Sequence, residues 1–351
     1  MSALPKVTVC VPVRNGARTI ARTLDSILAQ DYANFEIIVS DNGSTDETAK
    51  IVHNYAGQGV RYYSNSQIEA FGESNWNYIL SLAQGPLIAL YHADDIYTST
   101  MLRRQAEFLQ VHPKSSAVFT MTQTIDEQDC PIRMGDLRLP RELRGRDFFE
   151  FSEFFNAVLK YHTFTYVPTM MTRKPVIEKV GNFRFQMFGS ASDIDLYLRM
   201  ARQWGEIGII DEPLHKYRIG EFQGSAVIAK NRTELPDFYR AIDAHLNDSN
   251  EMKVVYAQSL AFYEMYRAAD HVICAQNLLA KRRTSEAREH LVEVLHMRHF
   301  MTALRRPGVL ARLLAGIGLW IAIGLGFGTF LGQQVSRAYA CRNSWQRKEI
   351  K

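Results

Sequence analysis

The first ninety residues of the chain alternate between short apolar runs and longer segments with helical periodicity. The apolar runs are rich in β-branched residues and have the length of buried strands, which we expect at 6–11, 35–40, 60–63 and 86–90. The segments between them repeat apolar residues every three or four positions, which predicts helices at about 20–28, 44–55 and 73–83. Because strands that alternate with helices form βαβ units, the sequence predicts an α/β domain with a mostly parallel sheet.

Two local signals place the ends of these elements. Pro12 follows the first apolar run and is expected to end that strand. Ser44 and Glu47 have the spacing of a capping box, which predicts that a helix opens here and continues to about Tyr55.

The next part of the chain is less regular, and its elements are predicted from shorter signals. We expect strands at 117–123, 164–172 and 206–210, a polar loop at 124–146, and helices at 147–160, 173–180 and 193–203, followed by mostly helical chain from about 227 to 300. The helix at 147–160 is very aromatic, and we expect its aromatic residues to pack against the sheet.

Two adjacent carboxylates follow the fourth expected strand, in the stretch Tyr91-His92-Ala93-Asp94-Asp95. Carboxylates beside an apolar core are costly unless something pairs with them. Clustered carboxylate oxygens suit Mg²⁺ or Mn²⁺, and Mg²⁺ is usually held by one or two carboxylates together with substrate phosphates. The stretch therefore predicts a metal–diphosphate site centred on Asp94. The alternative is a helix N-cap, since Asp95 and Thr98 precede a periodic segment at 101–109.

Polar residues also follow two other expected strands. Asn15 comes after the first strand, and Asp41 comes after the second. In open α/β sheets, ligands bind outside the carboxyl ends of the strands. We therefore expect Asn15, Asp41 and Asp94 to share one crevice.

The charge of the chain is concentrated near its C-terminal end. The chain has 351 residues and a net charge of +4, while 281–312 contains eight Lys or Arg and three Glu, a local excess of +5 (8 − 3). This basic run borders a long apolar segment, which favours a membrane surface over nucleic acid as its partner. The four cysteines have neither zinc-ligand nor disulfide spacing, and no secretory signal is expected at the N-terminus.

The segment 313–336 contains no charged residue. About 20 apolar residues suffice to span a bilayer. Gly324, Gly328 and Gly332 are four residues apart, a pattern that suits close helix packing. The glycines could also break the helix and leave a hairpin in one leaflet. A third alternative is a buried helix in an oligomer interface.

Five motifs occur in the order seen in one enzyme family. They are Val9–Gly16 (VCVPVRNG), Ile38–Asp46 (IVSDNGSTD), Asn75–Asn77 (NWN), Ala93–Asp95 (ADD) and Ser192–Arg199 (SDIDLYLR). Over about residues 5–225 the chain resembles family 2 glycosyltransferases of GT-A fold. The resemblance implies a GT-A domain at 1–225, a helical extension at 226–304, and a membrane-associating segment with a tail at 305–351.

The resemblance also implies roles for individual residues. Asp94 matches the last residue of the family's DxD motif, which holds Mn²⁺ or Mg²⁺ on the donor diphosphate. Asp193 matches the general base, with Asp195 as the next candidate, and Arg199 matches an arginine that we expect to be structural. The residues implied in binding the nucleotide sugar are Pro12, Val13, Asn15, Asp41, Asn75, Asp94 and Asp95, of which Asp41 would bind the base.

The sequence departs from the family pattern at three places. His92 stands at the first DxD position and is a second candidate for a metal ligand. Ser192 replaces the Glu that commonly precedes the base. The family's histidine after Tyr217-Arg218 is missing, and His215 could replace it only if the loop folds back.

The resemblance implies an inverting transferase that moves a sugar from a nucleotide-diphosphate donor to an acceptor hydroxyl. A cation neutralises the leaving diphosphate, and a carboxylate removes the acceptor proton. The expected acceptor is a glycan or a lipid-linked saccharide at the cytoplasmic face of a membrane, with no nucleic-acid partner and with self-association through the C-terminal segment as an open alternative. The other function in view is a non-catalytic relative that binds nucleotide sugar or scaffolds an assembly.

Overall fold

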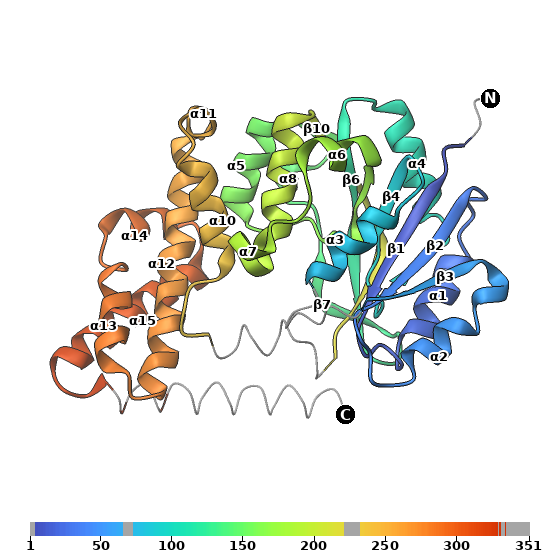
Figure 1. The fold of residues 1–351 in the computed structure, drawn as a ribbon. Coiled ribbons are helices and arrows are strands. Elements are labelled where there is room, and N and C mark those ends of the chain that lie inside the picture. The colour runs from blue at the N-terminus through green and yellow to red at the C-terminus, as the bar shows by residue number, and fades with distance from the viewer. Residues whose placement is uncertain (1–3, 66–72, 221–231, 329, 331–333, 335–351) are drawn as a thin grey trace. The chain divides into compact units, whose positions relative to one another are not determined.

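A computed structural model describes residues 4–65, 73–220, 232–328, 330 and 334 of the chain (Figure 1). The chain forms two compact units, Met1–Glu221 and Phe222–Lys351. The first unit contains a sheet and helices, and the regular structure described in the second unit is helical.

The first unit holds the strands of the described chain. They are β1 (Val7–Val13), β2 (Phe35–Asp41), β3 (Val60–Ser64), β4 (Leu87–Leu90), β5 (Ile96–Tyr97), β6 (Ser115–Ile125), β7 (Pro131–Leu137), β8 (Phe148–Phe149), β9 (Met171–Arg173) and β10 (Glu206–Arg218). Its α-helices are α1 (Ile20–Leu28), α2 (Thr48–His53), α3 (Glu73–Leu82), α4 (Met101–Val111), α5 (Phe151–Tyr161), α6 (Lys174–Val180), α7 (Phe185–Phe188) and α8 (Ser192–Gln203). Short 3₁₀ turns are η1 (Ala56–Gln58), η2 (Arg141–Leu143), η3 (Val167–Thr169) and η4 (Gly189–Ala191).

The strands form one sheet in the order β3-β2-β1-β4-β9-β6-β10-β5, with β7 beside β6 and β8 beside β10. β3, β2, β1 and β4 run parallel to one another, and β6 runs parallel to β10. β9 runs antiparallel between β4 and β6 and joins these two parallel parts. The expected α/β fold is confirmed. The sheet is mixed, with its longest ladders parallel, and each antiparallel pair involves a strand from the less regular part of the sequence.

Both faces of β1 are buried. Val7, Val9 and Val11 belong to one apolar cluster with Ile20 and Leu24 of α1. The alternate residues face the other side, where the Cys10 Sγ atom lies 3.9 Å from the Ile79 carbonyl oxygen of α3. A strand that is buried on both faces has a continuous apolar sequence, and this is why the sequence predicted β1.

Two predictions about element ends were wrong. β1 continues through Pro12, which pairs with Ser40, because β4 borders β1 only as far as Cys10 and no partner on that side requires a proline N–H. The helix expected from Ser44 begins at Thr48 without a capping box. The side chain of Ser44 is used elsewhere, accepting a hydrogen bond from the Asn15 backbone.

Several predictions for residues 124–218 were wrong or incomplete. The expected loop at 124–146 contains β7, which begins at Pro131 beside β6. The aromatic helix begins only at Phe151, where Glu150 and Glu153 form a capping box, and its Phe154 and Phe155 are buried as expected. The turn η3, with Pro168 as its second residue, interrupts the expected strand at 164–172, which is reduced to β9. The strand expected at 206–210 continues past a bulge to residue 218.

The second unit consists of α10 (Asp237–Leu246), α11 (Ser249–Met252), α12 (Ala257–Ala280), α13 (Thr284–Val292), α14 (Met297–Ala303) and α15 (Pro307–Gly324). The helices α12 to α15 all contribute to a single apolar cluster, through residues such as Leu278, Leu291, Ala303 and Leu313 respectively. The expectation that helices dominate after residue 227 is confirmed for the described residues.

Candidate functional site

The loops that follow β1 and β2 are tied together by hydrogen bonds. Three successive backbone N–H groups, those of Asn15, Gly16 and Ala17, donate to side chains of the second loop, at 2.8 to 3.1 Å. The Asn15 amide oxygen accepts from the Thr45 backbone at 2.8 Å in return. Asn15 has φ 52°, a left-handed conformation that asparagine tolerates better than most residues. The acceptors in the second loop are Ser44, Thr48 and Asp46.

A cavity of about 260 Å³ opens beside this pair of loops. It is lined by Pro12, Val13, Arg14, Asn15, Gly16, Thr19, Trp76, His92, Ala93 and Asp94. The ends of β1 and β4 therefore meet at one crevice, as expected for Asn15 and Asp94. Asp41 is not among the described lining residues.

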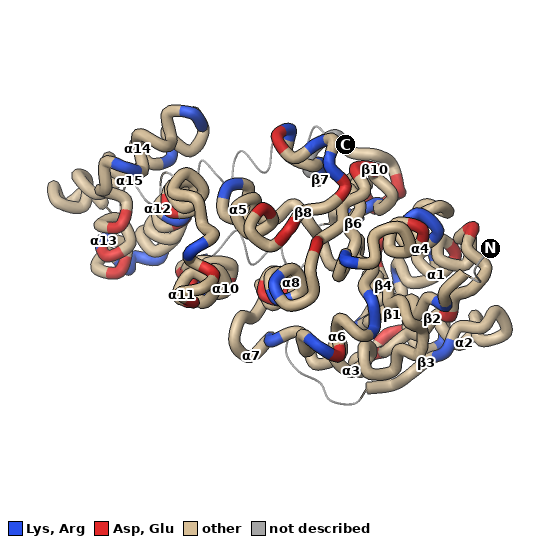
Figure 2. The backbone as a smooth tube through the Cα atoms, turned by 90° about the horizontal axis from the view of Figure 1, so that it is seen from above, with Lys and Arg blue, Asp and Glu red and all other residues tan. Residues whose placement is uncertain are grey.

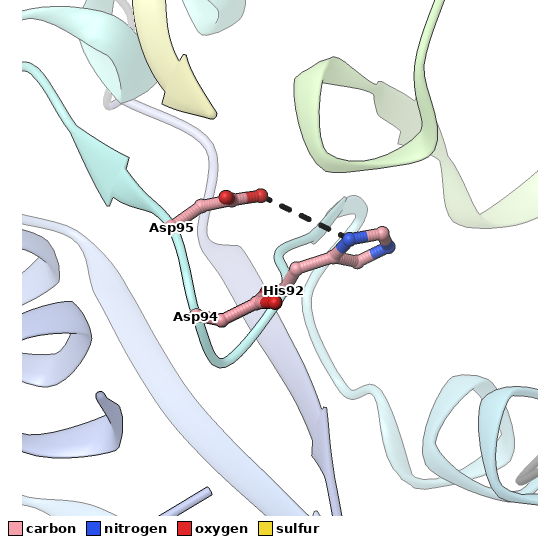
Figure 3. A group of neighbouring side chains, drawn as sticks. All are labelled: His92, Asp94 and Asp95. Atoms are coloured by element: carbon pink, nitrogen blue, oxygen red, sulfur yellow. Dashed lines mark ion pairs between the residues drawn. The ribbon is translucent and has the colours of Figure 1, made fainter. Parts of the chain in front are cut away.

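His92, Asp94 and Asp95 form a compact cluster of metal-ligand types in the loop after β4. One side-chain ligand atom of each lies within 4.8 Å of the others, and Figure 3 shows the three side chains projecting to the same side of the loop. His92 Nδ1 lies 3.9 Å from Asp95 Oδ2 (Figure 3). His92 and Asp94 reach the cavity, whereas the side chain of Asp95 points into the protein and is fully buried.

Asp95 holds the loop against the end of β10. Its Oδ2 lies 2.9 Å from His215 Nε2, and its Oδ1 accepts from the Arg218 backbone N–H at 3.0 Å. Thr23 Oγ1 donates to the Asp95 carbonyl, and Arg218 Nε donates to the Asp94 carbonyl. The Asp95 carboxylate thus fixes the position of Asp94 rather than capping α4, whose N-cap residue is Thr100.

The same contacts locate His215. Its second ring nitrogen, Nδ1, lies 3.0 Å from Thr122 Oγ1, and the side chain is fully buried in the sheet. Both ring nitrogens are therefore engaged inside the protein, and His215 does not replace the missing histidine of the family motif.

We expect Asp95→Ala to lower the free energy of unfolding by about 3 kcal/mol, because the variant leaves buried hydrogen-bond donors without their charged acceptor. Asp94→Ala is the matched control. Within the described chain, the Asp94 carboxylate accepts no hydrogen bond from another residue's side chain, so its removal should leave stability unchanged or raise it. Urea unfolding of both variants checks the pair, and equal losses would contradict the difference in roles.

The electrostatics of the cluster fit a cation. Burial, together with the adjacent Asp95 carboxylate, raises the pKa of Asp94 to about 7. Burial lowers the pKa of His92, which keeps a ligating nitrogen available at neutral pH. His92 Nε2 is buried and has no hydrogen-bond partner among the residues that the structure describes. A divalent cation would offset the repulsion between the carboxylates and give the unpartnered atoms a ligand role.

Two further residues of the predicted site lie outside the described cavity lining. The Asp41 carboxylate is buried and accepts hydrogen bonds of 2.8 Å from the Ser44 N–H and the Tyr62 hydroxyl. The Asn75 amide is also buried. Its Nδ2 donates to the Ser40 carbonyl at 2.7 Å, and its Oδ1 accepts from Asn65 at 3.2 Å.

Asp193 and Asp195 differ sharply in their surroundings at the start of α8. Asp193 is partly buried, and its Oδ1 accepts a hydrogen bond from the Ile194 N–H at 2.7 Å. Burial raises its pKa to about 6. Asp195 is fully buried and forms ion pairs with Arg184 and Arg199. Of the two, Asp193 is the carboxylate not committed to an ion pair within the described chain.

Arg199 ties the helix to the preceding loop. Besides pairing with Asp195, it donates to the backbone carbonyls of Val180 and Asn182, the latter at 2.8 Å. These contacts fit the structural role expected for this arginine.

The sequence did not lead us to predict that an aromatic side chain lines the cavity. Trp76 stands in the NWN motif, but no role was predicted for it, and it lines the cavity with its ring centroid 5.3 Å from that of His92. It also packs edge-on against Phe183 and Phe185. The neighbouring Asn77 exchanges two hydrogen bonds with the Phe183 backbone, at 2.9 and 3.1 Å. The signal available in the sequence was the pair Asn75 and Asn77 on either side of Trp76, because both side-chain amides hydrogen-bond to backbone groups of other elements.

A family model for glycosyl transferase family 2 matches residues 8–181 of the chain. The chain is 35% identical over 130 residues to the putative glycosyltransferase EpsE of Bacillus subtilis, covering 36% of this chain and 46% of that protein. It is 30% identical over 155 residues to the Escherichia coli UDP-Glc:alpha-D-GlcNAc-diphosphoundecaprenol beta-1,3-glucosyltransferase WfaP, covering 44% of this chain and 56% of that protein. The matches thus span about half the length of these relatives.

Solved structures share the fold over most of the chain. Residues 1–349 of S. aureus TarS in complex with UDP-GlcNAc match with a TM-score of 0.61 and 17% identity, covering 92% of each chain. The mannosyltransferase PcManGT of Pyrobaculum calidifontis, in complex with GDP-Man and Mn²⁺, matches with a TM-score of 0.56 and 18% identity, covering 98% of this chain and 88% of that one. The fold is therefore that of GT-A glycosyltransferases with a C-terminal helical extension. With the family model and the identifiable relatives pointing the same way, residues 8–181 form a glycosyl transferase family 2 domain.

Proposed function

We propose that the protein transfers a sugar from a nucleotide-diphosphate sugar to an acceptor hydroxyl with inversion at the anomeric carbon. The observation that carries the proposal is the meeting of Asp94 and His92 with the β1–α1 loop in one cavity. The family and the fold support this reaction, and TarS and PcManGT were solved with nucleotide sugars.

In this proposal, the donor lies along the loops after β1 and β2. Pro12, Val13 and Asn15 contact the nucleoside, and their loop is held in shape by the hydrogen bonds from Asn15, Gly16 and Ala17. Asp41 accepts from a ring N–H of the base, for which a carboxylate offers more acceptor sites than the two that it uses here. Asn75 acts indirectly, because it fixes the end of β2 that carries Asp41.

Asp94 would hold a divalent cation, with His92 as a second ligand and Asp95 as the residue that positions the loop. When bound, Mn²⁺ or Mg²⁺ stabilises the charge that develops on the leaving diphosphate. A Mn²⁺-bound structural neighbour supports this assignment. The chain's own contribution is to hold the Asp94 carboxylate at the cavity, where no other side chain of the described residues donates a hydrogen bond to it.

Asp193 would serve as the general base. Its raised pKa, about 6, lies closer to neutrality than that of an ordinary aspartate, which improves proton abstraction while keeping the group ionised at pH 7. The carboxylate takes the proton of the acceptor hydroxyl as that oxygen attacks the anomeric carbon. Asp195 cannot take over this role without breaking its ion pairs with Arg184 and Arg199.

We further propose that the acceptor is a glycan or lipid-linked saccharide and that the protein works at the cytoplasmic face of a membrane. The printed name of WfaP describes a diphosphoundecaprenol-linked acceptor. The helix α15 has the length and composition of a membrane-associating helix, with a mean hydropathy of 1.6. The basic residues before it favour an anionic leaflet.

Thermal-shift measurements with UDP-, GDP- and dTDP-sugars, each in Mn²⁺ and in EDTA, test donor binding. We expect one nucleotide class to raise the midpoint in Mn²⁺ and to lose most of that effect in EDTA. If no nucleotide sugar shifts the midpoint in either buffer, the protein is not a nucleotide-sugar transferase. Binding without turnover would instead favour the non-catalytic alternative, which the departures at His92 and Ser192 motivate.

A further inference from the structure

Within the described chain, α15 is buried along one side. Leu313, Gly316, Leu319 and Ala322, three residues apart along the helix, are its buried positions. At Gly316 an added Cβ atom would lie 2.7 Å from Val272 Cγ2 and 3.3 Å from Val294 Cγ1. The glycine thus lets α15 approach α12 closely, and Leu313 and Leu319 complete the core shared with α12, α13 and α14. These contacts make α15 an integral part of the second unit.

The opposite side of α15 is apolar and exposed. Leu314, Ile321 and Leu325 follow one another at intervals of seven and four residues, which places them on a single side. Their side chains are 53%, 49% and 68% exposed. We call these three residues the outer face of α15. A contiguous exposed apolar surface marks a site of contact with a partner or a membrane.

The whole of α15 has the length and composition of a membrane-spanning helix, but the part of it that carries no charge is shorter than the thickness of a bilayer. The helix ends at Gly324, and Gly326 adopts a left-handed φ of 83°. From Leu313, the residue after Arg312, to Gly324 there are twelve residues, about 18 Å of helix at 1.5 Å per residue. The hydrocarbon core of a bilayer is about 30 Å thick. Gly324 also has open space around it, so the expected glycine face is not used there for helix packing, and Gly332 lies outside the described residues.

Basic residues accompany the outer face. Arg305 and Arg312 are exposed and form no ion pair within the described chain. Arg306 lies over the Phe262 ring of α12 at 5.8 Å, and Figure 2 shows basic positions on both α14 and α15. An anionic membrane surface offers negatively charged headgroups to these arginines and an apolar interior to the outer face of α15.

We propose that α15 lies in the plane of the membrane, with its outer face inserted into one anionic leaflet while its other side stays packed on α12. This proposal deepens the membrane association proposed above and rests on it. Among the alternatives that the sequence left open, the packing of Leu313 and Leu319 in the core of the second unit favours a segment that embeds in one leaflet over one that spans the bilayer. The exposed Arg305 and Arg312 favour an anionic leaflet over a second copy of the chain.

Vesicle flotation of the full-length protein tests the surface. The wild type should float with vesicles of phosphatidylcholine and phosphatidylglycerol, and much less with phosphatidylcholine alone. Ile321→Asp/Leu325→Asp should lose binding at least tenfold. Arg305→Gln/Arg312→Gln should weaken it roughly 30-fold, which corresponds to about 1 kcal/mol for each charge. Val111→Asp, at a 73% exposed position in the first unit, is the matched control and should bind like the wild type.

Tryptophan quenching tests the orientation. Trp320 is 37% exposed on α15, and lipids brominated near the headgroup should quench its fluorescence more than lipids brominated deep in the chains. Trp320→Phe identifies its share of the signal. The donor-induced thermal shift should persist in all α15 variants, so that a failure here is distinguishable from a failure of the proposed transferase.

Three results would overturn the proposal. Wild-type protein that stays unbound to both vesicle types has no docking surface. A dimer that Ile321→Asp/Leu325→Asp dissociates would show that a second copy covers the outer face. Stronger quenching by deep bromines, with protein that alkaline carbonate does not release, would mean that the segment spans the bilayer.

Discussion

Asp193→Asn should lower turnover by roughly 10² to 10⁴ while leaving donor affinity nearly unchanged. The amide keeps the size of the carboxylate but cannot accept the proton of the acceptor hydroxyl. The donor contacts proposed above do not involve Asp193, so calorimetric titration with the nucleotide sugar should give a similar dissociation constant. A variant with normal turnover would show that the base lies elsewhere.

The pH dependence of the wild type provides a second measure of the same residue. Asp193 must be ionised to act as a base, and burial raises its pKa to about 6. At saturating Mn²⁺, which keeps Asp94 ionised, the value of kcat/KM should therefore be level above that pH and fall tenfold for each pH unit below it. This limb should be absent from Asp193→Asn.

Asp195→Asn is the control that separates chemistry from structure. It removes the carboxylate that pairs with Arg184 and Arg199, so it should destabilise the protein by about 3 kcal/mol. Protein that remains folded should retain an acidic limb near pH 6. If Asp195→Asn rather than Asp193→Asn abolished that limb, the two roles would be reversed.

Asp94→Ala should abolish metal-dependent donor binding and lower turnover by roughly 10³ or more, since the cation supplies several kcal/mol of transition-state stabilisation. The reason is that the donor diphosphate loses the ligand that links it to the loop after β4. Calorimetry with the nucleotide sugar, in Mn²⁺ and in EDTA, measures the effect. The heat in Mn²⁺ should fall to the level that the wild type gives in EDTA.

Asp31→Asn is a suitable control for this variant, because Asp31 is a surface carboxylate paired with Arg103 and removed from the cavity lining. It should bind donor like the wild type in both buffers. Unchanged Mn²⁺-dependent binding in Asp94→Ala would remove Asp94 from the metal site and leave His92 and Asp95 to be tested.

The sequence predicted the first half of the sheet well because its signals are local. β1, β2 and β4 are largely buried strands with flanking helices, β3 is the partly buried edge strand, and their apolar runs have few other interpretations. The crevice followed from the rule that ligands bind at the carboxyl ends of parallel strands, and Asn15 and Asp94 do line one cavity.

The errors came from contacts between distant residues. β7 is a strand because β6 lies beside it, although its own sequence reads as a loop. Asp95 resembled a site residue as much as Asp94 did, and only the position of His215, 120 residues later, shows that its side chain is directed inward. No role was predicted for Trp76, because the helical pattern of 73–83 does not show that one side of α3 borders the cavity.

The most direct test of the account is a transfer assay with the full-length protein, a nucleotide sugar that binds, Mn²⁺ and a lipid-linked saccharide acceptor. The quantities measured are the nucleoside diphosphate released and the anomeric configuration of the glycosylated product. The account predicts release that depends on Mn²⁺, is lost in Asp193→Asn, and yields a β-linked product from an α-linked donor. Donor that binds in Mn²⁺ but is turned over by neither the wild type nor Asp193→Asn, with any acceptor supplied, would contradict it.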